Sequence, residues 1–331
     1  MSTFTQVCGI DVSKDSLDYR LTKRTDERLI QDDQIANDPK AIHSLFSKPA
    51  FNQTLFVIEY TGNYSAKLIH ELSCLNRPLS MVNPLQSKQF MSVLGQTNKN
   101  DKQAAFALSA LGCRMPLRLY KVPSQHMQKR KQILGTLQAL EKQQRMLKNQ
   151  LHALEHLPVL EEQSFEALKS VLASVEAQIA PLQERLYEAA QDEGFNEKKK
   201  YATSVKGIGA KTAEAILVVT NGLADFDSPD KLSKFLGLTP LSHHSGTSVR
   251  RRGGITKFGS NQVRSLLYMC TRSAIRYNQP CKELYQRLRA KGKPHKVAAV
   301  AVMHKLVKQV YACVTSKTMF DNEYHLKNKK D

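Results

Sequence analysis

The sequence has 331 residues, 41% of them hydrophobic, which supports packed domains and excludes a chain that is disordered throughout. Its 49 Lys and Arg residues exceed its 30 Asp and Glu residues, giving a net charge of +19 at pH 7. The six scattered cysteines form no C-x-x-C pair, and neither a signal peptide nor a membrane-spanning run is evident, so we expect a soluble cytoplasmic protein without disulfides or zinc.

The first part of the chain, residues 1–123, alternates short β-rich runs with helical patterns. Three strands joined by tight turns precede a helix, and further strands and helices alternate after it. The order β-β-β-α-β-α-β-α is that of the ribonuclease-H-like (RuvC-like) fold, so we expect an α/β domain of this class. The expected strands are 7–12, 17–21, 28–31, 54–60 and 79–82, and the expected helices are 41–47, 65–75 and those ending near 113.

Residues 124–197 have the spacing of paired helices. Apolar residues recur at alternating intervals of four and three in two segments, from Ile133 to Leu154 and from Phe165 to Ala189, with a break at Pro158. This spacing predicts a coiled-coil helical hairpin or an oligomerising coiled coil. Gln144 lies in the predicted seam, and Pro181 is expected to bend the second helix.

Residues 198–331 carry nearly all of the net positive charge, with 26 Lys and Arg residues against 8 Asp and Glu residues. A concentrated surplus of this kind is typical of a surface that binds nucleic-acid phosphates, although it also suits a surface that is merely well solvated. The pattern here is mainly helical, with helices expected at 212–220, 261–277 and 296–314, a short segment at 231–238, a polar loop at 240–260 and a frayed tail.

Three acidic residues are candidates for a metal site. Asp11 and Glu59 end two predicted strands, where a carboxylate is costly unless it meets solvent, a cation or a donor. Asp101 opens a predicted helix, where it also suits a simple N-cap. Taken singly, each acid suits a structural role; together they would suit hard Mg²⁺ (or Mn²⁺) ions that promote phosphoryl transfer.

Two segments of the basic part suit phosphate contacts. The turn Lys206, Gly207, Ile208, Gly209, followed by Lys211 and Thr212, has the form of a helix-hairpin-helix turn, in which backbone amides approach a phosphate; a plain connection between helices is the alternative. Downstream, Ser245 precedes three arginines. An exposed serine hydroxyl beside cations suits a nucleophile for phosphodiesters, whereas the same loop could simply hold DNA. The arginines are Arg250, Arg251 and Arg252.

Several motifs in one order resemble those of the Piv/MooV-type DEDD recombinases and the related insertion-sequence transposases, over nearly the whole chain. The matching segments are G-I-D-V-S-K at 9–14, E-x-T-G-x-Y at 59–64, N-P at 83–84, N-K-x-D at 98–101, G-I-G-x-K-T-A at 207–213, G-L-T-P through S-G-x-S-V-R at 237–250, and K-x-G-x-x-x-x-R-x-x-L-Y-M at 257–269.

The resemblance implies a RuvC-like DEDD domain followed by a C-terminal transposase domain. In that family Asp11, Glu59 and Asp101 would bind Mg²⁺, and Ser245 would form a transient phosphoserine link to DNA. It also implies a guide (bridge) RNA and a homo-oligomer, a dimer or tetramer, in which the two halves of the active site meet across protomers. We count Lys257 and Arg264 of the last motif among the expected nucleic-acid contacts.

One departure from the family pattern concerns the acidic motif, which ends K-x-D-x-x-D-A. The fourth carboxylate is replaced by Ala104, so either three acids suffice or activity is weakened while nucleic-acid binding survives. The alternatives to a transposase are a Piv-like site-specific invertase, a RuvC-like nuclease in which water attacks, and a non-enzymatic nucleic-acid-binding remnant.

Overall fold

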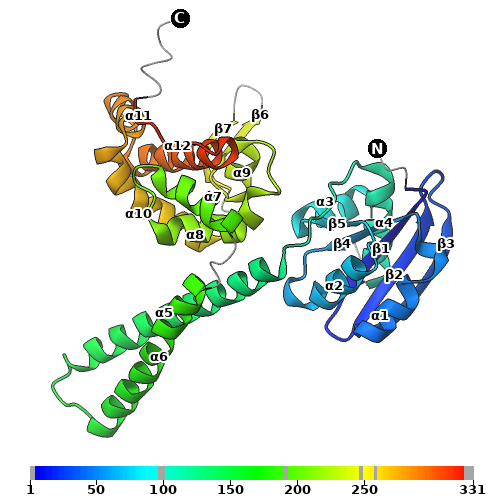
Figure 1. Cartoon of the computed structure of the whole chain (residues 1–331), viewed down its shortest axis with the longest axis horizontal. Helices are drawn as coiled ribbons and strands as arrows, with labels where there is room; N and C mark the ends of the chain where they lie inside the picture. The colour runs from blue at the N-terminus through cyan, green and yellow to red at the C-terminus, as the bar shows by residue number, and fades with distance from the viewer. Residues whose placement is uncertain (1–3, 96–100, 189–192, 246–248, 257–258, 324–331) are drawn as a thin grey trace, which may run out of the picture. The chain divides into compact units, whose positions relative to one another are not determined.

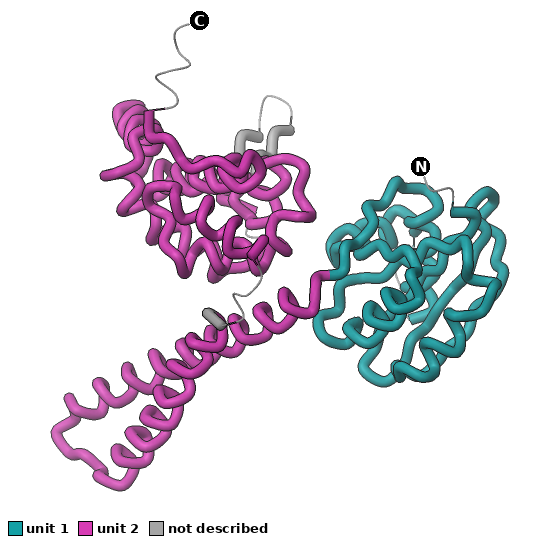
Figure 2. The backbone as a smooth tube through the Cα atoms, viewed as in Figure 1, with its two compact units in different colours: residues 1–122 teal, residues 123–331 magenta. Residues whose placement is uncertain are grey.

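The computed structural model describes residues 4–95, 101–188, 193–245, 249–256 and 259–323. The chain divides into two compact units, residues 1–122 and residues 123–331 (Figure 2). The division of the second unit into a helical hairpin at 124–197 and a basic domain at 198–331 stays a prediction.

A five-stranded mixed sheet forms the centre of the first unit, with strand order β3-β2-β1-β4-β5 (Figure 1). Strand β2 is antiparallel to β1 and β3, whereas β4 is parallel to β1 and β5. Together with its helices, the sheet has the predicted order β-β-β-α-β-α-β-α. The elements are β1 (Gln6–Val12), β2 (Ser16–Lys23), β3 (Leu29–Ala36), α1 (Pro39–Phe46), β4 (Thr54–Glu59), α2 (Ala66–Cys74), β5 (Leu79–Val82), α3 (Pro84–Val93) and α4 (Asp101–Arg114).

Helices cover both faces of this sheet. On one face, α1 and α2 pack their apolar residues over a core that includes Tyr19, Phe46 and Phe56. On the other, α4 packs closely against β1, because Gly9 has no side chain there. A Cβ at Gly9 would collide with the backbone of Ala105 and Ser109, so this glycine permits the close approach of α4 to the sheet.

The second unit begins with two long helices, α5 (Gln125–Leu154) and α6 (Glu162–Glu188), which pack against each other as a hairpin (Figure 1). In the predicted seam, Leu137, Leu147 and Leu151 are buried, and the Gln144 side chain donates to Glu176 Oε1 at 2.9 Å. Helix α6 continues through Pro181. An oligomerising role for this hairpin stays a prediction.

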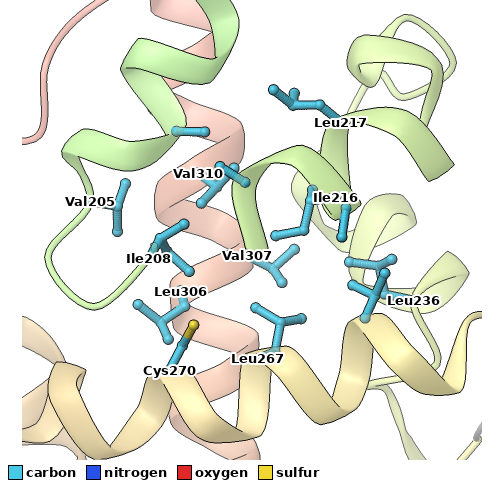
Figure 3. Packing of buried hydrophobic residues seen from close by; sticks show 14 of the residues in the cluster. Val205, Ile208, Ile216, Leu217, Leu236, Leu267, Cys270, Leu306, Val307 and Val310 are labelled. Carbon is cyan, nitrogen blue, oxygen red and sulfur yellow. The ribbon is translucent and has the colours of Figure 1, made fainter. Parts of the chain in front are cut away.

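The rest of the second unit is a helical domain with a small β-hairpin. A large apolar core joins its helices, with Ile216 of α8, Leu267 of α10 and Val307 of α12 among its buried residues (Figure 3). The elements are α7 (Glu193–Ser204), α8 (Ala210–Val219), α9 (Pro229–Phe235), β6 (Pro240–Ser245), β7 (Val249–Ile255), α10 (Asn261–Tyr277), α11 (Gln279–Ala290) and α12 (His295–Ser316).

Two parts of this domain differ from the sequence-based expectation. The segment expected as a polar loop at 240–260 contains the antiparallel pair β6 and β7. Helix α11 was not expected at all. It begins at Gln279, the side chain of the preceding Asn278 caps its start, and Pro280 occupies its first turn, where proline is well tolerated. The predicted frayed tail lies outside the described residues.

Helix α12 is long and apolar enough to cross a membrane on length and composition alone, although His and Lys residues interrupt its apolar run. Half of that apolar stretch is buried within the protein. Val302, Leu306 and Val310 belong to the core of the helical domain, so the apolar character of α12 has a structural explanation.

A buried ion pair joins the helical hairpin to the basic domain. Arg130 of α5 and Glu214 of α8 are 1% and 4% exposed, and Arg130 Nη1 lies 2.5 Å from Glu214 Oε1. Lys199 Nζ of α7 lies 2.6 Å from the second oxygen of Glu214, and the Arg130 guanidinium lies 4.0 Å from the centre of the Phe195 ring. One buried carboxylate therefore pairs with two cations, the buried Arg130 and the partly exposed Lys199.

Replacing Glu214 by Gln is expected to lower the free energy of unfolding of the second unit by about 3–5 kcal/mol, because it leaves Arg130 buried without a counter-charge. The matched control is Glu141→Gln, which removes an ion pair to Lys211 on the surface and should cost only about 0–1 kcal/mol. Urea unfolding of the full chain, with hydrogen exchange of α8 amides to identify the second unit, measures both. Equal losses in the two variants would contradict the special role of the buried pair.

Candidate active site

Asp11 and Glu59 lie at the carboxyl ends of two adjacent parallel strands, β1 and β4. The register aligns Ile10 with Ile58, so the next residues, Asp11 and Glu59, come at the same level of the sheet. Because side chains alternate along a strand, both belong to the face on which Gly9 approaches α4. Both residues are partly exposed. The sheet therefore brings two of the three predicted acids together.

A third carboxylate on this face was not singled out from the sequence. Asp18 of β2 pairs directly with Asp11 across the antiparallel ladder. It is 4% exposed, and its Oδ2 accepts a hydrogen bond from the Gln34 side chain at 2.9 Å. We call the sheet end that holds Asp11 and Glu59 the acidic edge. Only the strand register shows that Asp18 lies next to it, because a spacing of seven residues between Asp11 and Asp18 does not by itself indicate that the two are neighbours.

Asp101, the third predicted acid, is exposed at the start of α4. Among the residues that the structure describes, no group of three or more His, Cys, Asp and Glu side chains is arranged to hold a metal ion. The adjacent carboxylates Asp11 and Glu59 still fit Mg²⁺ chemically, because this ion is usually held by one or two carboxylates together with water and substrate phosphate.

One buried amide holds the loops around the acidic edge. Asn37, 5% exposed, donates through Nδ2 to the carbonyl of Ser13 at 2.9 Å and to that of Tyr64 at 3.0 Å. The backbone carbonyl of Asn37 accepts a hydrogen bond from Lys67 Nζ at 3.1 Å. Ser13 closely follows Asp11 and Tyr64 follows Glu59, so Asn37 ties together the turns that leave both acidic strands.

Two other titratable groups of the sheet remain neutral near pH 7. Burial, with a smaller contribution from Asp33, raises the pKa of Tyr19 to about 12. Burial also raises the pKa of the Cys8 thiol well above its usual value. Cys8 is therefore unsuited to act as a thiolate nucleophile on β1.

Ala104 lies on α4, one turn after Asp101, and is 5% exposed. Residues three apart share a helix face, so an acid at 104 would come next to Asp101. Replacing Ala104 by Asp is expected to tighten Mn²⁺ binding by about tenfold or more, because it adds an anionic oxygen ligand. Calorimetric titration with Mn²⁺ measures this, with the neutral isostere Ala104→Asn as control. The same gain in the Asn variant would contradict a ligand role for position 104.

The glycine-rich turn of the second unit is held rigidly between α7 and α8. Gly207 has φ +105°, and a Cβ there would press against Ala274 of α10. The Asn278 side chain donates to the Lys206 carbonyl at 3.1 Å. The Lys206 and Gly209 residues are exposed, as is Lys211, which pairs with Glu141 at 2.6 Å.

Two of the predicted nucleic-acid contacts are interior residues. Thr212 is 5% exposed, and its hydroxyl lies 3.3 Å from Cys270 Sγ. Arg264 is 9% exposed and donates to the carbonyls of Leu236 and Gly259. Both side chains are largely buried within the domain, which a sequence pattern alone cannot show, and their contact with a nucleic acid stays a prediction.

Ser245 is the last residue of β6, and the register pairs it with Val249 at the start of β7. His244 pairs with Arg250, His243 with Arg251, and Ser242 with Arg252. The predicted serine and the three arginines thus share one short hairpin. Lys257 lies outside the described residues.

Comparisons with known proteins bear on both units. A family profile for the DEDD transposase of IS110, described as a transposase, matches residues 8–157, and one described as the transposase IS116/IS110/IS902 family matches residues 199–286. A "Pilin gene-inverting protein" of Moraxella lacunata is 29% identical over 279 residues, covering 81% of this chain and 82% of the relative. The "Transposase for insertion sequence element IS1111A" of Coxiella burnetii is 23% identical over 270 residues, covering 73% of each.

Among solved structures, the RuvC protein of T. thermophilus in complex with a Holliday junction substrate matches 35% of this chain and 99% of that chain. The sequence identity is 17% and the TM-score is 0.27.

Proposed function

This chain belongs to the IS110-type DEDD transposases and recombinases, and from that premise we propose that it cuts DNA strands and rejoins them to new partners. The observation that supports this best is the acidic pair Asp11 and Glu59, aligned on neighbouring strands within the part of the chain that matches the DEDD profile. The basic domain, which matches the second transposase profile, supplies the charge for holding DNA.

The proposed chemistry divides the work between the two units. Asp11 and Glu59, with Asp101, would hold Mg²⁺ or Mn²⁺. Such a metal, when bound, polarises phosphoryl oxygens and helps to activate an attacking oxygen. The Ser245 hydroxyl would form a bond to phosphorus as the bond to the departing DNA strand breaks, and its proton would be passed on to the departing oxygen. Rejoining reverses this exchange and needs no outside energy, because the serine ester conserves the phosphodiester bond.

The wider assembly is part of the same proposal. A guide RNA would direct the protein to its DNA, and a homo-oligomer would bring the acids of one protomer to the serine of another. The protein would work in the prokaryotic cytoplasm, associated with the nucleoid when bound to DNA. The exposed turn residues Lys206, Gly209 and Lys211 and the hairpin arginines support phosphate contacts in the second unit.

Inversion of a DNA segment is the second candidate function. It is favoured by the relative that is named for pilin gene inversion and matches 81% of this chain. Both reactions use the same cutting and joining, so the DNA beside the gene separates them: an insertion-sequence boundary with a non-coding RNA region favours transposition, and inverted crossover sites favour inversion.

The test incubates the purified full-length protein with DNA from its element ends, the RNA transcribed beside it, and Mg²⁺. A denaturing gel then separates the products. Cut strands attached covalently to protein support the serine reaction. Free ends without attached protein would instead indicate a hydrolytic nuclease, and tight DNA binding without cutting or Mn²⁺ binding would indicate a non-enzymatic remnant.

A further inference from the structure

The segment from Asn261 to Lys296 concentrates positive charge to an unusual degree. It contains nine Lys and Arg residues and a single acidic residue, Glu283. Helices α10 and α11 and the start of α12 make up this segment, and the three helices contact one another in the second unit (Figure 1).

Six exposed cations of this segment form neither an ion pair nor a side-chain hydrogen bond with the described part of the chain. They are Arg272, Arg276, Arg287, Lys291, Lys293 and Lys296. Elsewhere in the second unit some cations are paired, such as Lys211 with Glu141 and Lys308 with Asp230. Like charges gathered without partners repel one another, so the cluster costs free energy unless an anionic partner covers it.

A small aromatic cluster fixes the turn between α11 and α12 to both preceding helices. His295 Nδ1 lies 2.8 Å from the Tyr285 hydroxyl of α11, and its Nε2 lies 3.5 Å from the Tyr268 hydroxyl of α10. Arg289 Nη1 also donates to the Lys293 carbonyl at 2.7 Å. The lysines at 291, 293 and 296 are therefore presented on a well-held turn.

The cations on α10 belong to the same surface. Tyr268, Arg272 and Arg276 follow one another at intervals of four residues, so they share a face of α10. Tyr268 meets His295, which connects this face to the lysine turn. Arg287 and Lys291 are likewise four residues apart. We call the six cations, together with Tyr268, His295 and Tyr285, the α10–α12 surface.

We propose that the α10–α12 surface binds the phosphate backbone of duplex DNA, as a second contact separate in sequence from the glycine-rich turn and the serine hairpin. The choice of DNA rests on the proposed function. A duplex backbone is favoured over unpaired bases because Tyr268 and Tyr285 already contact His295, so the surface offers fixed positive charge more than free aromatic faces for stacking.

The test measures binding of the full chain to duplex DNA of arbitrary sequence, without divalent metal, over a series of salt concentrations. The variant replaces Lys291, Lys293 and Lys296 by Gln. Because each lost phosphate contact lowers the salt slope by about 0.9, the slope should fall by about 2 to 3, with binding roughly 10- to 100-fold weaker at low salt. The control replaces Lys40, Lys48 and Lys88 of the first unit by Gln, which removes the same charge and should change the slope by less than about 1.

A second variant, Arg272→Gln with Arg276→Gln, approaches the same surface from α10 and should lower the slope by about 1 to 2. Thermal unfolding must match that of the wild type, and if the lysine variant fails to fold, the arginine variant decides. Equal salt slopes in the lysine variant and its control would overturn the proposal. The same titrations with an RNA duplex and with single-stranded DNA provide a second check: if the lysine variant lost binding to either of these while its binding to duplex DNA stayed intact, the proposal would also be overturned. Since no strand is cut, this result is independent of whether the serine reaction occurs.

Discussion

Replacement of Ser245 by Ala is expected to abolish the covalent protein–DNA adduct and to lower the rate of strand joining by at least about 10³-fold, because alanine lacks the hydroxyl that would form the ester with DNA. DNA binding should remain, since the change removes only one hydroxyl. Reaction with labelled element-end DNA, followed by denaturing electrophoresis, measures the adduct, and a salt series measures binding.

The matched control is Ser242→Ala, which removes a hydroxyl from the same strand β6 and should leave the adduct in place. A second serine, Ser248, follows in the same motif. An adduct that survives Ser245→Ala and disappears with Ser248→Ala would transfer the nucleophilic role to that residue.

Replacement of Asp11 by Asn, or of Glu59 by Gln, is expected to lower strand cleavage by about 10²- to 10³-fold, because each change removes one anionic oxygen ligand from the paired strand ends. DNA affinity should stay the same or rise, because a negative charge near the bound phosphates has been removed. Cleavage rates over a Mg²⁺ titration and binding in the absence of metal give the two readouts.

Asp15→Asn provides the control for this experiment. Asp15 is exposed in the turn between β1 and β2, close in sequence to Asp11, and lies outside the acidic pair. Undiminished cleavage in both Asp11→Asn and Glu59→Gln would remove the acidic edge from the mechanism. A loss of binding together with cleavage would instead point to a damaged fold.

The strongly patterned elements could be predicted from the sequence. The buried strand β4 is a continuous apolar run, and its observed bounds, Thr54–Glu59, differ from the prediction by one residue. Helix α10 spans Asn261–Tyr277 as predicted, because Ser260 caps its start and Asn278 ends it. In such segments local signals and burial agree, so no information about neighbours is needed.

Elements whose identity depends on a partner were harder to predict. Strand β3 extends to Ala36, well past the predicted end, because pairing with β2 and not apolar alternation defines it. The hairpin β6–β7 is rich in Ser, His and Arg and resembles a loop in composition. Helix α11 carries a proline, yet Asn278 and Pro280 serve as start signals there.

The candidate site was predictable only in part for the same reason. Two strand-end acids could be expected to converge, because adjacent parallel strands end at one edge. That Asp18 faces Asp11 depends on an antiparallel register, and that Thr212 and Arg264 are interior depends on how α8 and α10 pack. The association of Asp11, Glu59 and Asp101 with Ser245 in one reaction stays a prediction.

The attachment of α5 to the basic domain has a mechanical consequence. Arg130 near the start of α5 and Glu141 further along both contact α8, while the 13 residues from there to Leu154 extend about 20 Å beyond the second contact. This stretch is a rigid helical extension of the domain. A partner bound at the tip of the hairpin would apply a torque to α8, and through α8 to the glycine turn that precedes that helix.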